Sequence, residues 1–335
     1  MYNTDNISAV VLSFLSYKRT IQNCSELTVN EYYIDLRTFF RYITAIRNND
    51  DLNNIEKVDI SRINEAFCDS IRSEEIYSFL LYLANKRENK PAARARKLSA
   101  IRAFYKYHTV KSRLLKNNPV KDIETPTLKH KLPKYLSIDE SIGLLNSVEK
   151  SSKTYERDYA ILTLFLNCGM RLSELVNINL GDIDEKLESL IVTGKGNKQR
   201  KIYLNTACRS ALQNYLNVRQ VRAAEGGVKI KDKNALFISR LGTRISNKTV
   251  QWLVQKQLNS AGLKNKKYST HKLRHTAATL MYNSGNVDIL VLKNILGHEQ
   301  LNTTQIYTHV SDKKMKNAMD ENPLANIKES KNAKD

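Results

Sequence analysis

The sequence contains little cysteine and little proline, and it has no long hydrophobic run. Its 335 residues include four cysteines and five prolines. The cysteines lie far apart without a Cys-x-x-Cys pair, so we expect neither a zinc site nor a disulfide framework. The longest apolar stretches, 76–84 and 159–170, are shorter than the roughly 20 residues that span a bilayer. The N-terminus has no basic segment before an apolar one, so we expect no signal peptide, no membrane partner and a cytoplasmic location.

Positive charge is what the chain has in excess. Lys and Arg number 54 against 34 Asp and Glu, which gives a formal net charge of +20. Residues 90–134 alone hold thirteen basic and two acidic side chains. A solvated helix face is one explanation, but this density favours a surface that contacts the phosphates of nucleic acid. The residues that we expect to contact DNA are Arg94, Arg96, Lys97, Arg102, Lys106, Lys198 and Arg200.

The length and the proline pattern predict two domains. At roughly 150 residues per domain, the chain is long enough for two. Residues 117–136 hold three of the five prolines and show little periodicity, which is typical of a linker. We therefore predict a helical DNA-binding domain at 1–116, a second domain at 137–327 and a disordered tail at 328–335.

Apolar periodicity predicts a mainly α fold with a small antiparallel β-sheet. Strand-like segments at 189–193 and 201–204 flank a basic, glycine-containing turn, which indicates a hairpin. Trp252, beside Leu253, is expected in the core, and 219–234 is expected to be a surface loop without an assigned role. The predicted helices include 28–45 with Thr28 as N-cap, 73–85, 94–108, one that begins with a Ser137–Glu140 capping box, 158–168, 247–261, 270–283 and 288–296;.

Several residues of the second domain suit attack on a phosphodiester. Guanidinium groups match phosphate oxygens, a tyrosine can act as a covalent nucleophile, and Lys or His can move protons. No Walker loop, Gly-x-Gly-x-x-Gly or His-Glu-x-x-His motif occurs;. His271 and His275 are four residues apart, but no third ligand lies near them in sequence, so we expect no metal. The candidate set is Arg171, Lys195, His271, Arg274, His298 and Tyr307.

These residues resemble the motifs of the tyrosine recombinases in order and in spacing. The matching segments are GMRLSEL with Arg171, TGKGNKQR with Lys195, HKLRH with His271 and Arg274, LGH with His298, and TTQIYTHV with Tyr307. The N-terminal segments SELTVNEYYIDLRTFFRYI and RARKLSAIRAFYKY are similar to the core-binding domain of that family. The two-domain length makes the chain most similar to the Xer-type members.

The resemblance implies site-specific recombination through a 3′-phosphotyrosine intermediate, without ATP, metal or any other cofactor. Tyr307 is then the nucleophile, Arg171 and Arg274 stabilise phosphoryl charge, and Lys195 protonates the departing 5′-oxygen. His271 assists proton transfer and His298 bonds the phosphate. Glu174 and His275 are expected to support these residues without reacting.

The resemblance also implies a C-shaped clamp of the two domains on DNA, and four protomers on two duplexes. The tetramer consists of this chain alone or includes a second recombinase, and a C-terminal tail helix at 310–319 links the protomers. Chromosome segregation is the role typical of Xer-type enzymes. An integrase or excisionase of a mobile element, a DNA invertase and a topoisomerase share the same chemistry and stay open. A non-cleaving DNA-binding accessory protein is the alternative of another class.

Overall fold

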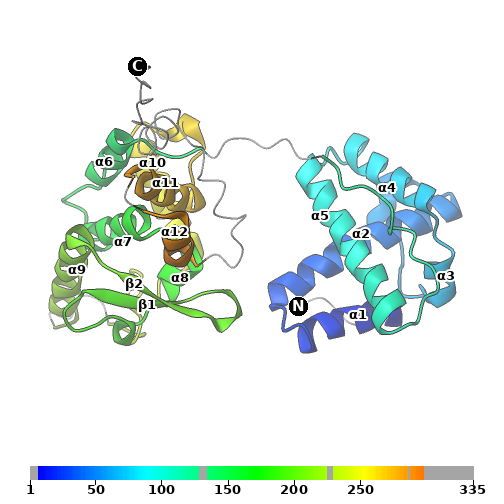
Figure 1. Ribbon diagram of the computed structural model, residues 1–335, viewed down its shortest axis with the longest axis horizontal. Coiled ribbons are helices and arrows are strands. Elements are labelled where there is room, and N and C mark those ends of the chain that lie inside the picture. The colour runs from blue at the N-terminus through cyan, green and yellow to red at the C-terminus, as the bar shows by residue number, and fades with distance from the viewer. Residues whose placement is uncertain (1–6, 128–133, 225–228, 286, 298–335) are drawn as a thin grey trace, which may run out of the picture. The chain divides into compact units, whose positions relative to one another are not determined.

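The structure is a computed structural model that describes residues 7–127, 134–224, 229–285 and 287–297. At Lys195 and at 222–224 it describes the backbone alone. The chain divides into two compact units, Met1–His130 and Lys131–Asp335, and each is built mainly of helices (Figure 1). None of the helices in the described ranges combines the length and the apolar character needed to cross a membrane.

The first unit is a bundle of helices. Ser25 caps its longest helix, because the Ser25 hydroxyl accepts a hydrogen bond from the backbone N–H of Thr28;. This helix therefore begins at Glu26, and Thr28, the predicted cap, lies inside it. The elements are α1 (Ala9–Thr20), α2 (Glu26–Asn48), a 3₁₀ segment (Leu52–Lys57), α3 (Glu65–Asp69), α4 (Ser73–Asn85), α5 (Pro91–Lys106) and a π-helical turn (Tyr107–Lys111).

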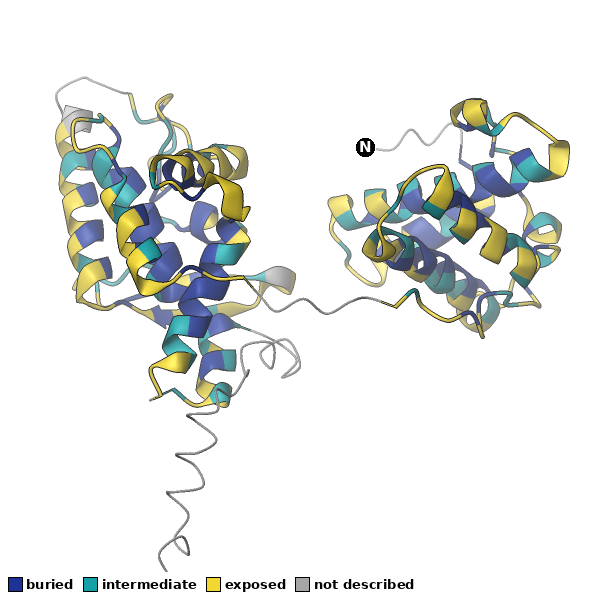
Figure 2. Ribbon diagram, turned by 90° about the horizontal axis from the view of Figure 1, so that it is seen from above, coloured by how far each residue is buried: buried dark blue, intermediate teal, exposed yellow. Residues whose placement is uncertain are grey.

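An aromatic cluster forms the core of the first unit. The rings of Phe14 and Phe40 each pack edge-on against Phe104, with centroids 5.7 and 5.3 Å apart. The buried faces of the helices turn toward this core (Figure 2). The same core includes Val120 and Ile123, so part of the segment predicted as a linker packs on the first unit.

The second unit is organised around a buried central helix, α7. This helix packs against α9 and α11, and it ends at Gly169, whose φ of 59° is left-handed;. The predicted Ser137–Glu140 capping box is present at the start of α6. The helices are α6 (Ile138–Asn146), α7 (Tyr155–Cys168), α8 (Leu172–Asn177), α9 (Thr206–Ala224), α10 (Asn247–Ser260), α11 (Thr270–Asn283) and α12 (Ile289–Leu296).

The predicted hairpin is confirmed as a two-stranded antiparallel sheet in the described part of the chain. Strands β1 (Ser189–Thr193) and β2 (Gln199–Tyr203) pair with Leu190 opposite Ile202. These two residues face the core, while Ile191 and its partner Lys201 face outward. Between the strands the chain makes one tight turn with Gly196 at φ 72°. The fold class is therefore mainly α with a small antiparallel sheet.

Two further local expectations were wrong. Trp252 is 63% exposed, because α10 buries Val250, Leu253 and Val254 and the helical repeat turns position 252 away from them. Residues 219–224 are not a loop but the end of α9. The guanidinium of Arg219 is buried there and donates to the carbonyl oxygen of Ala235 at 3.1 Å.

Candidate active site

The turn between α7 and α8 brings Arg171 and Glu174 together. Arg171 is the N-cap of α8, and its backbone N–H donates to Glu174 Oε2 at 2.6 Å. Its guanidinium Nη1 donates to Glu174 Oε1 at 2.7 Å. The Glu174 side chain is only 1% exposed, whereas that of Arg171 is 36% exposed. The carboxylate thus fixes Arg171 while the arginine keeps access to solvent.

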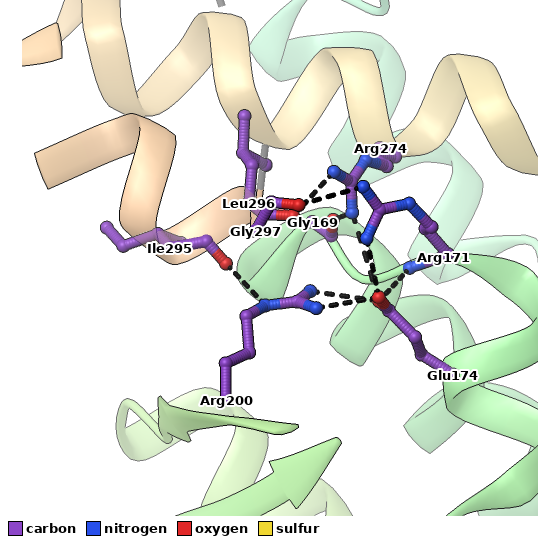
Figure 3. Close-up of polar contacts among 8 residues, drawn as sticks. All are labelled: Gly169, Arg171, Glu174, Arg200, Arg274, Ile295, Leu296 and Gly297. Carbon is purple, nitrogen blue, oxygen red and sulfur yellow. Dashed lines mark hydrogen bonds and ion pairs between the residues drawn. The ribbon is translucent and has the colours of Figure 1, made fainter. Parts of the chain in front are cut away.

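Helix α11 places a second arginine next to Glu174 and Arg171. Arg274 is buried and donates to the carbonyl oxygens of Gly169 and Leu296, each at 2.7 Å. Its Nη1 also lies 3.9 Å from Glu174 Oε2. Arg171 Nη2 in turn donates to the carbonyl oxygen of Gly297 at 3.0 Å. The end of α7, the start of α8, α11 and the end of α12 therefore meet around one carboxylate (Figure 3).

A third arginine comes from the hairpin. Arg200 on β2 donates from Nη1 and Nη2 to the two oxygens of Glu174, at 2.6 and 2.9 Å. Burial alone raises the pKa of the Glu174 carboxyl, but the hydrogen bonds from Arg200 and Arg171 outweigh it and lower that pKa to about 2;. Glu174 is therefore ionised at neutral pH, and its charge permits three guanidinium groups to lie close together.

The hairpin turn begins beside the same carboxylate. A Cβ placed on Gly194 would lie 3.3 Å from Glu174 Oε1 and 3.9 Å from Arg171 Nη1. The turn is closed by a hydrogen bond from the backbone N–H of Gly194 to the carbonyl oxygen of Lys198 at 2.8 Å. Lys195 therefore comes directly after a glycine at which any side chain would lie against Glu174.

A histidine pair lies on α11 next to Arg274. The Nε2 atoms of His271 and His275 are 3.0 Å apart, so one ring donates a hydrogen bond and the other accepts it. Burial, followed by the positive charges of Arg274, Lys272 and Arg171, lowers the pKa of His271. The neutral form of His271 is therefore favoured, and it can accept a proton.

The structure thus brings together the predicted Arg171, Glu174 and Arg274, and it places His271 and His275 on the helix that carries Arg274. The side chain of Lys195 and all of His298 and Tyr307 lie outside what the structure describes. In the described part of the chain, no group of three or more His, Cys, Asp or Glu side chains is arranged to hold a metal ion.

Comparisons with known proteins find relatives that cover most of the chain. Residues 134–314 match the model of the phage integrase family. The chain is 49% identical over 318 residues to the tyrosine recombinase XerC of Caldanaerobacter subterraneus subsp. tengcongensis, which covers 94% of this chain and 87% of the relative. It is 33% identical over 305 residues to the XerC of Thermodesulfovibrio yellowstonii, covering 91% and 93% of the two chains.

The chain belongs to the phage integrase family. It is an Xer-type tyrosine recombinase, an enzyme of site-specific recombination that cleaves and rejoins DNA. A solved structure of the same fold is the XerH site-specific recombinase bound to palindromic difH substrate in a post-cleavage complex. Its TM-score is 0.68 at 23% identity, with 93% of this chain and 84% of that chain covered. The Tn1549 transposon integrase in complex with transposon right end DNA also has this fold, with a TM-score of 0.67, 18% identity and coverage of 93% and 98%.

Two basic residues that we predicted to contact DNA are instead paired with buried carboxylates. Lys97 is buried, and its ammonium lies 2.8 Å from Asp35 Oδ1. Arg200 is held inward by Glu174, as described above. In both cases the buried carboxylate lies far away in sequence, so charge and periodicity alone gave no sign of the pairing.

The remaining basic residues of α5 keep contact with solvent. Arg96 is exposed and pairs with Glu31 and Asp35, each at 2.7 Å. Arg94 donates to the carbonyl oxygen of Asn89 at 3.0 Å, and Arg102 is held by Thr125 at 2.6 Å. Lys106 is exposed. The lysine at the end of α5 therefore has the surroundings expected of a phosphate contact.

Proposed function

We propose that Tyr307 is the nucleophile with which this recombinase cleaves DNA. The tyrosine oxygen attacks the scissile phosphorus, the bond to the 5′-oxygen breaks, and a 3′-phosphotyrosine forms. The departing 5′-oxygen takes a proton from Lys195, and His271 takes the proton of the tyrosine. A 5′-hydroxyl from the partner duplex then attacks the phosphotyrosine and reseals the strand, so the bond energy is conserved throughout.

The observation that carries this proposal is the arginine cluster around Glu174. Three guanidinium groups share one carboxylate, so the cluster holds an excess of two positive charges beside a partly exposed Arg171. Such preorganised cations stabilise the charge that builds up on a phosphoryl group in the transition state. Arg171 and Arg274 are the residues that we assign to the phosphate oxygens, with His298 as a further hydrogen-bond donor.

Covalent capture in cells tests the nucleophile. Tagged wild type and Tyr307→Phe are purified under denaturing conditions, and any attached DNA is sequenced. We expect attached DNA only with wild type, because the variant lacks the attacking oxygen, while its affinity for duplex DNA stays within about twofold. Attached DNA with Tyr307→Phe would place the nucleophile elsewhere. Binding without any covalent DNA from wild type would indicate a non-cleaving accessory protein.

The captured sequence also identifies the biological role. We propose that the chain acts in the cytoplasm as a tetramer on two duplexes, alone or with a second recombinase, with the tail at 310–319 linking protomers. Chromosome segregation, the role typical of Xer-type enzymes, is the one that we propose for it. A single chromosomal site in the captured DNA supports that role, whereas the ends of a mobile element or an inverting segment would assign the enzyme to integration or inversion.

A further inference from the structure

Arg200 has surroundings that a DNA-contacting residue of the hairpin does not require. Its side chain is 14% exposed and extends from β2 toward α8 and α12 (Figure 3). Two of its nitrogens donate to Glu174, and its Nε donates to the carbonyl oxygen of Ile295 at 2.9 Å. One planar guanidinium thus joins the hairpin to two other elements of the second unit.

We propose that Arg200 is a positioning residue for strand cleavage. It orients Glu174 against Arg171 and holds the end of α12, from which the chain continues to His298 and Tyr307. The inference rests on the function proposed above, because it assigns to Arg200 the alignment of residues that act on the phosphate.

The first action of Arg200 runs through the carboxylate. Glu174 Oε1 accepts from both Arg171 Nη1 and Arg200 Nη1, and Oε2 accepts from Arg200 Nη2 and the backbone N–H of Arg171. Each carboxylate oxygen is therefore held from two sides. Without Arg200 the carboxylate loses its fork-to-fork partner, and the direction in which it holds the Arg171 guanidinium is no longer fixed.

The second action runs through the last carbonyl groups of α12. Three consecutive carbonyl oxygens each accept from a different arginine: Ile295 from Arg200, Leu296 from Arg274 and Gly297 from Arg171. The final carbonyls of a helix have no partner inside it and carry partial negative charge, so cations stabilise them. The arginines of the site and the end of α12 are therefore positioned together.

Gly297 shows how closely Arg200 approaches this helix end. Gly297 has a φ of 64°, and a Cβ there would lie 3.0 Å from both Cδ and Nη1 of Arg200. A glycine thus serves both the left-handed turn and the contact with the arginine. Lysine in place of Arg200 keeps the charge, but its single ammonium cannot reproduce the planar fork that serves Glu174 and Ile295 simultaneously.

The experiment separates positioning from DNA contact. Arg200→Lys and Arg200→Gln are compared with wild type, Tyr307→Phe and the matched control Lys201→Gln, which removes an exposed charge from the next residue of β2. The probe is a duplex with the sequence recovered by covalent capture. Duplex affinity and the rate of covalent attachment at saturating duplex are measured separately, well below each variant's melting temperature.

We expect the rate at saturating duplex to fall about tenfold in Arg200→Lys and about 100-fold in Arg200→Gln, as small misplacements of reacting groups do. Duplex affinity stays within about threefold, and Lys201→Gln reacts like wild type. Weaker binding with an unchanged rate at saturation would overturn the inference and return Arg200 to the DNA surface. Wild-type rates in both Arg200 variants would overturn it as well. In either case the proposed function would still hold, because it requires only that the wild-type enzyme forms covalent DNA.

A double-variant cycle checks that Arg200 acts through Glu174. If it does, adding Arg200→Gln to Glu174→Gln lowers the rate by much less than Arg200→Gln lowers it in wild type. If the rate reductions of the two single variants instead multiply in the double variant, Arg200 does not act through Glu174, and that part of the inference is overturned. If wild type itself leaves no covalent DNA, the proposed function fails first, and the inference about Arg200 fails with it.

Discussion

At the scale of single residues, Glu174 decides the chemistry of the site without being exposed to substrate. Its buried carboxylate binds the side chains of Arg171 and Arg200 and lies 3.9 Å from Arg274. Removing one partner of a buried ion pair is costly because the remaining charge has no compensation. The same cluster sets the electrostatic environment of His271, since Arg171 and Arg274 both disfavour a positive charge on its ring.

The pH dependence of cleavage follows from the lowered pKa of His271. The pKa of His271 lies below the ordinary value of about 6.5, mainly because the ring is buried;, so the neutral base predominates at neutral pH. At subsaturating DNA, which reports the free enzyme, we expect a rate that is flat from about pH 7 to 8 and falls at acid pH. His271→Gln should be slower and lose this decline. A wild-type rate that rises as the pH falls below 6.5 would contradict the proton-accepting role of His271.

At the scale of elements, a buried histidine ties two helices of the first unit together. His108, in the π-helical turn after α5, bonds the carbonyl oxygen of Val10 on α1 through Nε2 at 3.0 Å. A carbonyl only accepts, so Nε2 carries the proton, and Nδ1 accepts from the hydroxyl of Ser112 at 3.1 Å;. Burial lowers the pKa of His108 to about 4, which keeps this ring neutral.

Acid should therefore loosen the contact between α1 and α5. The unfolded chain binds a proton at His108 near pH 6.5 and the folded chain only near 4. The stabilisation that neutral His108 gives to the folded state is therefore complete above pH 6.5. It shrinks by up to roughly 3 kcal/mol as the pH falls to 4. Hydrogen exchange in the full chain should show faster exchange of α1 and α5 amides at pH 5 than at pH 7, after correction for intrinsic rates. His108→Gln, which does not titrate, should reduce this difference, and an equal difference in the variant would exclude His108 as its cause.

At the scale of the whole molecule, a net charge of +20 sets the affinity for DNA, but not every basic residue contributes to it. Lys106 is exposed at the end of α5, while Lys97 is buried against Asp35 on α2. Only a cation that reaches a phosphate releases counterions when DNA binds. Of these two lysines, nine residues apart on one helix, we therefore expect Lys106 to contribute to DNA affinity and Lys97 to the stability of the first unit.

Salt titration of binding distinguishes the two lysines. Lys106→Gln should weaken duplex binding and reduce the slope of log K against log salt by about one. Lys97→Gln should leave the slope unchanged and instead lower the stability of the first unit by about 2 kcal/mol, since Asp35 loses the bond from its buried partner and keeps only the one from the exposed Arg96;. The measurements are filter binding between 50 and 200 mM salt and urea unfolding. A slope that changes with Lys97 rather than Lys106 would reverse the assignment.

The sequence by itself determined the class of fold, the family and the order of the chemical groups. Apolar periodicity and capping residues are local, so the helices at α4, α6, α7 and α11 and the hairpin at β1 and β2 followed from neighbouring residues. The pairing of Arg171 with Glu174 also lies within one helical turn. These features depend on contacts between residues that are close along the chain.

Tertiary structure alone decided which charges face solvent and which are paired with buried carboxylates. Arg200 and Glu174 are 26 residues apart, and Lys97 and Asp35 are 62 apart. A basic residue beside solvent and one beside a buried carboxylate look the same in sequence, because burial and pairing arise only when distant elements pack. The same reason placed Trp252 outside the core, since the packing of α10 against the second unit selected which face of that helix is buried;.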